Sequence, residues 1–220
     1  MSVKLPVANP DEASTKQRLL DAAESLFAQQ GFPGTSLRAI TQLAQANLAA
    51  VSYHFGSKEN LFAAVIYRRL EPLNHQRILM LDAAEQRANG QPVPTEQILI
   101  AIIRPALAML RDPSEGGRNY VTLLSRCLSE PQSGLHSLVH DRFEPVFVRF
   151  LTALRNSLPH LSEPTFRWRT HLLLGALFYF VAQDEYLRKH TNGICSLDNT
   201  REAEAQFVAF GTAGLSAVEP

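Results

Sequence analysis

The chain has 220 residues with 21 basic and 21 acidic side chains, so its formal net charge is zero. Hydrophobic residues make up 45% of it and charged residues 19%, which excludes a wholly disordered chain. The balanced charge also excludes a uniformly basic nucleic-acid coat, so any nucleic-acid contact has to come from a local patch. At about 150 residues per domain, the length predicts one or two domains.

The two cysteines fit a reducing compartment, and the short apolar runs argue against secretion and membrane insertion. Cys127 and Cys195 are far apart and form no CxxC pair, so they cannot make a disulfide framework, and Cys127 is expected to be a small buried side chain. Residues 1–13 lack the apolar core of a signal peptide, and no apolar run reaches the roughly 20 residues that span a bilayer. A cytoplasmic protein without a membrane partner is expected.

Helical periodicity dominates the chain, and strand signals are almost absent. Residues 1–13 are predicted to be a flexible arm. Ser14 and Gln17 form a capping-box pattern at the start of the first helix, and Gly31 is its predicted stop. The pattern predicts an all-α fold of about nine helices. After the first, they lie at about 37–44, 48–55, 58–87, 95–111, 118–129, 135–157, 164–189 and 200–214.

Residues 35–55 have the pattern of a helix-turn-helix. Two short helices flank a tight turn near Gln45, and Asn47 is a candidate cap for the second. Val51 and Phe55 are predicted to face inward, which turns the opposite side of the second helix outward. Such a helix fits a major groove about 12 Å wide. The alternative is three small packed helices without a ligand.

Several side chains of this segment are candidates for DNA contact. Hydroxyls at the start of the second helix and an amine at the start of the fourth suit phosphates. For Arg38 the alternative is a solvated charge, for Leu48 a packed contact with Val51, and for His54 a packing role. The predicted DNA-binding residues are Thr35, Ser36, Arg38, Asn47, Leu48, Ala49, Ser52, Tyr53, His54 and Lys58.

Residues 16–62 resemble the DNA-binding domain of the TetR family of bacterial transcriptional regulators. The stretches "RLLDAAESLFAQQGFPGTSLRAI" and "YHFGSKENLF" carry the resemblance. It implies a DNA-binding domain over residues 14–57 and a helical ligand-binding and dimerisation domain over 58–220. The positions that match the family pattern are Phe27, Gly31, Phe32, Thr35, Ser36, Phe55, Ser57, Lys58, Glu59 and Leu61.

Two positions depart from the family pattern. Gln45 stands where the family usually has Gly, and a left-handed backbone there would cost about 1 kcal/mol. Ser52 stands where the family usually has a phosphate-contacting Tyr, with Tyr53 one residue further on. Which of these two side chains reads bases is left open.

The stretch "NLAAVSYHFGSKENL" is similar to the fatty-acid-responsive PsrA-type branch of that family. This narrower resemblance implies a small effector that is a fatty acid, its coenzyme A thioester or another lipophilic acid. Phe143, Phe147 and Phe178 are predicted to line its pocket, with plain core or dimer packing as the alternative.

The segment 172–182 is apolar nearly all round, so it has to be buried on two sides, by its own domain and by a second copy of the chain. A homodimer is therefore expected. His136 and His140 share a helix face but have no supporting ligands, so no metal is predicted, and neither is a cofactor.

No nucleophile elbow, P-loop or dinucleotide fingerprint is present, which argues against an enzyme. The expected function is a DNA-binding repressor, released from a palindromic operator by a small lipophilic effector. The alternatives are an activator and a DNA-binding protein without an effector.

Overall fold

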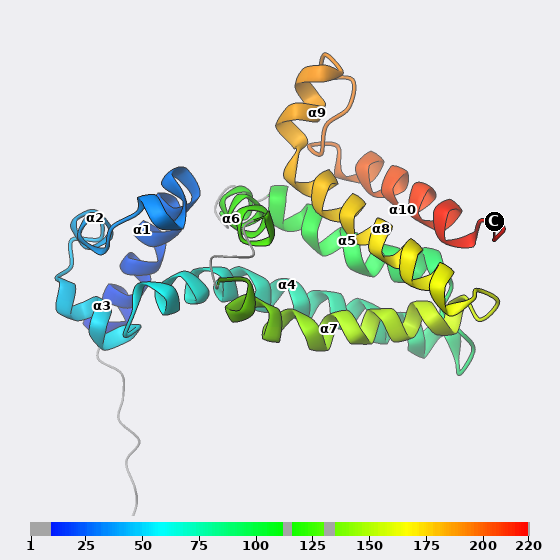
Figure 1. Ribbon diagram of the computed structural model, residues 1–220, viewed down its shortest axis with the longest axis horizontal. Helices are drawn as coiled ribbons and strands as arrows, with labels where there is room; N and C mark the ends of the chain where they lie inside the picture. Colours follow the sequence, from blue (N-terminus) through cyan, green and yellow to red (C-terminus); the bar gives the residue numbers. More distant parts are fainter. Residues whose placement is uncertain (1–9, 112–115, 130–134, 220) are drawn as a thin grey trace, which may run out of the picture. The chain divides into compact units, whose positions relative to one another are not determined.

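The computed structural model describes residues 10–111, 116–129 and 135–219, apart from the side chains of 10–13 and 125–141. These residues form ten α-helices and no strand, which confirms the all-α fold (Figure 1). The helices are α1 (Pro10–Gly34), α2 (Leu37–Leu43), α3 (Leu48–His54), α4 (Lys58–Ala88), α5 (Thr95–Arg111), α6 (Gly117–Ser129), α7 (Leu135–Ser157), α8 (Glu163–Ala182), α9 (Asp184–His190) and α10 (Thr200–Ser216).

The first helix differs from the prediction at both ends. It begins at Pro10 rather than after Ser14, whose hydroxyl accepts a hydrogen bond from Arg18 instead of capping the helix. Gly31 breaks the helix as predicted, with φ 73° and ψ 171°, but one more turn follows as far as Gly34. Residues 1–9 of the predicted arm lie outside the described residues.

The predicted helix over 164–189 is two helices, which makes ten in the described chain instead of about nine. Gln183 separates α8 from α9 with φ −113° and ψ 28°. The next side chain, Asp184, is buried, and its Oδ1 accepts the N–H of Leu197 at 2.8 Å. This tertiary hydrogen bond holds the chain at the point where the helix direction changes.

The chain forms two compact units. The first unit contains α1–α3, the start of α4 as far as Arg68, and residues 122–139; the second contains residues 69–121 and 140–220. Within the first, Arg68 binds Asp21 and the buried Glu24, which ties α4 to α1. Because α4 begins at Lys58 and continues into the second unit, the predicted division between residues 57 and 58 stays a prediction.

The core of the second unit is built from α4, α5, α7, α8 and α10. Ile98, Leu99, Ile103 and Leu107 repeat at helical spacing along one face of α5, and all four are buried. A Cβ at Gly211 would lie 2.8 Å from Leu99 Cδ1, so the glycine allows α10 to approach α5 closely. The unit therefore has a continuous helical core.

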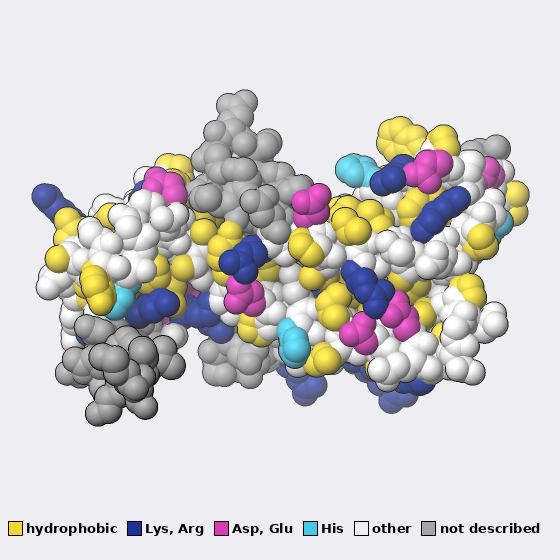
Figure 2. All heavy atoms as spheres, turned by 90° about the horizontal axis from the view of Figure 1, so that it is seen from below, with side chains coloured by type: hydrophobic (Ala, Val, Ile, Leu, Met, Phe, Trp, Pro, Cys, Tyr) yellow, Lys and Arg dark blue, Asp and Glu magenta, His cyan; other side chains and the backbone are white. Residues whose placement is uncertain are grey.

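Several charges on the second unit form ion pairs. Arg142 binds Glu71, and Arg149 binds both Asp82 and Glu85, so two arginines of α7 contact α4. On the face drawn in Figure 2, some basic side chains lie beside acidic ones. Among the described helices, none is long and apolar enough to span a membrane.

Candidate nucleic-acid interface

Aromatic packing and one arginine fix the frame that carries α2 and α3. The rings of Phe27, Phe32 and Phe62 pack together, with centroids 5.2 to 5.8 Å apart. Arg18 of α1 donates from Nε to the carbonyl oxygen of Ala44 at 3.0 Å, where α2 ends. This role of Arg18 is not evident from the sequence, because its partner lies 26 residues away.

The hydroxyl groups of Thr35 and Ser36, which precede α2, have different structural roles. Ser36 caps the helix, since its Oγ accepts the N–H of Ala39 at 3.1 Å, and its side chain is exposed. Thr35 is only 2% exposed, and its hydroxyl donates to the carbonyl oxygens of Gly31 at 2.8 Å and Leu26 at 3.2 Å. The structure thus contradicts a phosphate contact by the Thr35 hydroxyl, which holds the loop instead.

The turn between α2 and α3 adopts the left-handed conformation that the sequence analysis considered for Gln45. Its φ is 50°, a region that favours glycine. The turn closes through a hydrogen bond from the N–H of Ala46 to the Thr41 carbonyl oxygen at 2.9 Å. Gln45 therefore adopts the turn at the cost of backbone strain.

Capping and burial orient α3. Asn47 Oδ1 accepts the N–H of Ala50 at 2.8 Å, which caps the helix as predicted. Val51 and Phe55 are buried, also as predicted. Because these residues anchor one side of α3, the opposite side faces solvent.

The outward side of α3 mixes apolar, small and hydrogen-bonding groups. Ala49 and Ser52 are exposed, Leu48 is 48% exposed and Tyr53 is 74% exposed. The alternative of a buried Leu48 packed against Val51 is therefore wrong. His54 is half-buried and meets the Tyr53 ring edge-on, with centroids 4.9 Å apart, so it supports that ring.

The start of α4 combines free backbone amides with one cation. Ser57 Oγ accepts the N–H of Asn60 at 3.1 Å, and Lys58 is the first helical residue. The Lys58 ammonium lies 4.3 Å from the centre of the Phe32 ring, a cation–π contact that restrains it. Hydrogen bonds from its own backbone N–H and from Ser57 lower the pKa of Glu59. This end of the helix favours negative charge.

All ten predicted DNA-binding residues belong to the first unit, spread over the starts of α2 and α4 and along α3. Nine of them are exposed or half-buried, and Thr35 is the exception. Arg38 on α2 is among the exposed ones. For these nine residues the geometry does not test a contact with DNA, so their roles stay predictions.

The residues predicted to line a ligand pocket are not brought together at one described site. Phe147 is exposed in a groove of about 420 Å³ between α7 and α8, beside Trp168. Phe143 and Phe178 are half-buried and are not among the residues that line this groove. The predicted pocket at these three positions stays a prediction.

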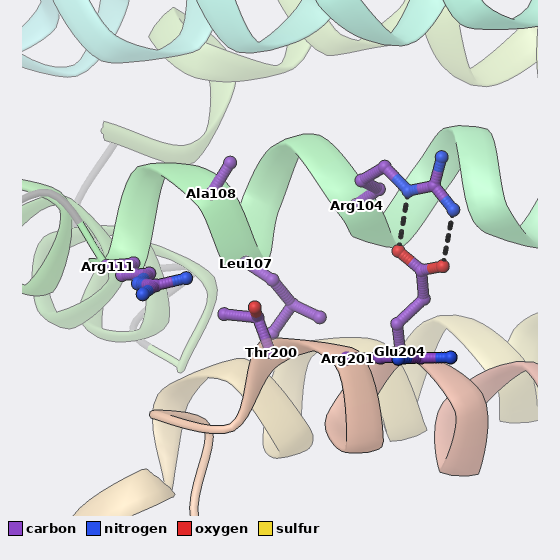
Figure 3. A pocket seen from close by; sticks show the side chains of 7 residues that line it. All are labelled: Arg104, Leu107, Ala108, Arg111, Thr200, Arg201 and Glu204. Atoms are coloured by element: carbon purple, nitrogen blue, oxygen red, sulfur yellow. Dashed lines mark hydrogen bonds and ion pairs between the residues drawn. The ribbon is translucent and has the colours of Figure 1, made fainter.

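A larger groove, of about 640 Å³, lies between α5 and α10. Figure 3 shows Arg104 reaching across it to Glu204, with a bidentate pair at 2.6 and 2.7 Å. Arg111 and Arg201 also line it. Among the described residues, no group of three or more His, Cys, Asp or Glu is placed to hold a metal. The side chains of Cys127, His136 and His140 lie outside the described residues.

Two family models match this chain. One, described as "Bacterial regulatory proteins, tetR family", matches residues 19–65. The other, described as "Tetracyclin repressor-like, C-terminal domain", matches residues 100–214, which is more than half of the chain. The first covers α2 and α3 entirely, and the second covers most of the second unit.

Curated relatives agree with these matches. The chain is 40% identical over 55 residues to the probable HTH-type transcriptional regulator YttP of Bacillus subtilis, covering 25% of this chain and 27% of that protein. It is 29% identical over 169 residues to the HTH-type transcriptional dual regulator CecR of Shigella flexneri, covering 75% and 74%. The first curated relatives are matched over 27% to 46% of their lengths, so the chain spans less than half of each.

A solved structure shows the same fold. The fatty acid degradation regulator FadR from Bacillus halodurans superposes with a TM-score of 0.64 at 12% identity, over 97% of this chain and 99% of that one. Identity this low shows the fold alone. The two family models lead to one conclusion: the chain belongs to the TetR family of bacterial transcriptional regulators, which is not a family of enzymes.

Proposed function

We propose that this protein is a DNA-binding transcriptional regulator that inserts α3 into the major groove of its operator. One observation carries the proposal: Val51 and Phe55 bury one side of α3, while the other side exposes Leu48, Ala49, Ser52 and Tyr53. A short helix held in this way presents its free side to base edges. Membership of the TetR family supports the same role.

Different residues of the proposed DNA-binding surface provide affinity for DNA and specificity for its sequence. Ser36, Arg38 and Lys58 are placed at helix starts or on the exposed side of α2, where they suit phosphates. Ala49 and Leu48 suit thymine methyl groups, and Ser52 and Tyr53 carry hydroxyls for bases or phosphates. Phosphate contacts position the protein, and the side chains of α3 select the sequence.

We propose that the protein acts as a homodimer through α8 and α10. Trp168, Leu172 and Tyr179 form an exposed apolar stripe on α8, and Phe210 is exposed on the neighbouring α10. Gly175 lies within the stripe, and a Cβ there would meet nothing within 4 Å. A second copy would cover this surface and bury the apolar segment 172–182 on its other side.

A dimer implies a palindromic or nearly palindromic operator, with half-sites about 34–36 Å apart. The proposed mode is repression in the cytoplasm, relieved by a small lipophilic effector bound in the second unit. The curated relatives include repressors and a dual regulator, so activation is the second candidate. The fatty-acid branch stays a prediction, because the neighbour concerned with fatty acid degradation shares only the fold.

Selection from a random duplex library tests this function. The full chain is expected to enrich one palindromic site, and Tyr53→Ala is expected to weaken binding to that site about 10-fold or more. Tyr186→Ala is the matched control, since Tyr186 is an exposed tyrosine of α9 in the second unit. Enrichment of no sequence, or equal loss of affinity in both variants, would contradict the proposal.

A further inference from the structure

The groove of about 640 Å³ between α5 and α10 is lined by residues that have no place in the proposed function. On α5 these residues are Arg104, Leu107, Ala108 and Arg111, which share one side of the helix because they are spaced by three, one and three residues. Leu107 is buried, whereas Arg104 and Arg111 are exposed. This wall of the groove is therefore basic at its two ends and apolar between them.

One cation of the groove already has its anion. Arg104 donates from Nε and Nη2 to the two carboxylate oxygens of Glu204 at 2.7 and 2.6 Å. This pair joins α5 to α10 across one part of the groove (Figure 3). Among the described residues that line the groove, Glu204 is the one acidic side chain. Its charge is therefore used by Arg104.

The other two cations, Arg111 and Arg201, have no such partner. Neither makes a hydrogen bond or an ion pair with another described residue. The acidic side chains close to Arg201 in the sequence are engaged elsewhere, since Asp198 binds Arg118 at 3.4 Å and Glu202 accepts a hydrogen bond from its own helix. The described part of the groove thus has two positive charges that are not compensated.

The two unpaired arginines lie at different places along the groove. Arg111 follows Arg104 by seven residues, which is about 10 Å along α5. Arg201 precedes Glu204 by three residues, so it lies on the side of α10 that carries the Arg104 pair. In the view of Figure 3, Arg111 and Arg201 lie on opposite sides of Leu107. Two separated charges with an apolar residue between them favour a ligand with an acidic group at each end.

The proposed dimer leaves this groove open. Arg201 and Phe210, which is exposed in the proposed interface, are nine residues apart on α10. Nine residues are about two and a half helical turns, so these two side chains lie on opposite sides of the helix. A second copy that covers Phe210 therefore does not cover Arg201.

We propose that this groove binds an organic dianion of the dicarboxylate type, with one acidic group at Arg111 and the other at Arg201. Each guanidinium donates two parallel hydrogen bonds to one carboxylate, and the two charges of the ligand balance the two unpaired cations. Leu107 and Ala108 contact the part of the ligand between its acidic groups. The start of α10 at Thr200 also favours negative charge in the groove.

This ligand differs from the lipophilic effector of the proposed function. Only two apolar side chains, Leu107 and Ala108, line the groove, beside three arginines and one glutamate. A mostly apolar acid with a single charge would leave one of the two arginines uncompensated. The inference therefore goes beyond the proposed function, and it does not depend on DNA binding.

Calorimetry on the full chain at low ionic strength tests the proposal with succinate, adipate and azelate, which differ in the separation of their carboxylates. Adipate or azelate is expected to bind about 10-fold more tightly than succinate, and about 10-fold more tightly than the monocarboxylate of its own length, hexanoate or nonanoate. Inorganic phosphate, a compact anion, is expected to bind no better than succinate. Added salt is expected to weaken binding, because both arginines are exposed.

Three substitutions locate the site. Arg111→Met and Arg201→Met are each expected to weaken binding of the preferred dicarboxylate about 10-fold, to the level of the monocarboxylate. Arg87→Met is the matched control, because Arg87 is an exposed arginine in the last turn of α4, in the second unit and outside the groove. Without ligand, all three variants are expected to melt within about 2 °C of the wild type, since none of them removes a described partner.

Several results would overturn the proposal. These are equal affinity for the three dicarboxylates, tighter binding of phosphate or of a monocarboxylate, or no binding of any of them. If Arg111→Met or Arg201→Met binds the dicarboxylate as the wild type does, the groove is not the site. If either variant melts several degrees lower, its arginine serves the fold. Equal loss of affinity in Arg87→Met would show that the general charge of the protein, and not the groove, attracts the dianion.

Discussion

At the scale of single residues, two local caps could be predicted, whereas the failure of the capping box at Ser14 and the long-range partners could not. Ser36 and Asn47 cap their helices because the cap and the amide it accepts are three residues apart in the sequence. Thr35 was misjudged because its hydroxyl donates to the carbonyl oxygens of Leu26 and Gly31, and this requires the fold of the loop.

Gln45 offers a test of backbone strain. Gln45→Gly is expected to stabilise the chain by about 0.5 kcal/mol, because relief of the left-handed backbone outweighs the extra freedom of glycine in the unfolded chain. Gln42→Gly, in the exposed and regular part of α2, is expected to destabilise it by about 1 kcal/mol. Urea unfolding measures both. The same sign for both substitutions would show that the turn is unstrained.

At the scale of helices, periodicity located two long elements that glycine or proline flanks. The predicted spans 95–111 and 135–157 coincide with α5 and α7. The junction of α8 and α9 was missed because neither Gly nor Pro marks it, and the hydrogen bond between Asp184 and Leu197 joins segments 13 residues apart. Periodicity reports which side of a helix is apolar, so it cannot reveal a break made by tertiary contact.

The contact of α7 with α4 predicts a pH-dependent stability. The hydrogen bond from Arg149 lowers the pKa of Glu85 in the folded protein below its ordinary value of 4.5. A lowered folded pKa contributes stability above about pH 4.5, and this contribution is lost as the pH falls through the folded value. Arg149→Gln is therefore expected to cost up to about 1 kcal/mol at pH 7, since the pair is partly exposed.

Denaturant unfolding between pH 7 and pH 3 checks this prediction. The difference between wild type and Arg149→Gln is expected to shrink as the pH falls through the Glu85 pKa. Arg167→Gln is the control, because its bridge to Glu163 lies within a single exposed turn of α8 and is worth about 0.3–0.5 kcal/mol. A difference for Arg149→Gln that persists unchanged at low pH would mean that packing, not charge, joins the two helices.

At the scale of the whole molecule, net charge bears on DNA binding, and the distribution of apolar residues bears on association with a second copy. Zero net charge says only that DNA binding has to be local, and the proposed surface is local, with Arg38 and Lys58 as its basic groups. The apolar segment 172–182 was more informative, because its pattern indicates an exposed apolar surface. One of its sides packs into the core through Leu177, whereas Leu172 and Tyr179 are exposed. A pattern in one chain predicted an exposed apolar surface, but the sequence cannot say which residues a second copy would cover.

Leu172→Glu tests whether that surface joins two copies. Leu172 is 65% exposed, so a glutamate there is accommodated by the single chain but would place an unpaired charge in the proposed interface. We expect a folded monomer by light scattering, and operator binding about 100-fold weaker, because two half-sites are no longer engaged by one linked pair of α3 helices. Ile194→Glu is the matched control, since Ile194 is 86% exposed outside the α8 stripe and should leave the dimer intact. If Leu172→Glu stays dimeric and binds the operator as the wild type does, the two copies meet elsewhere, and the exposed stripe of α8 needs another partner.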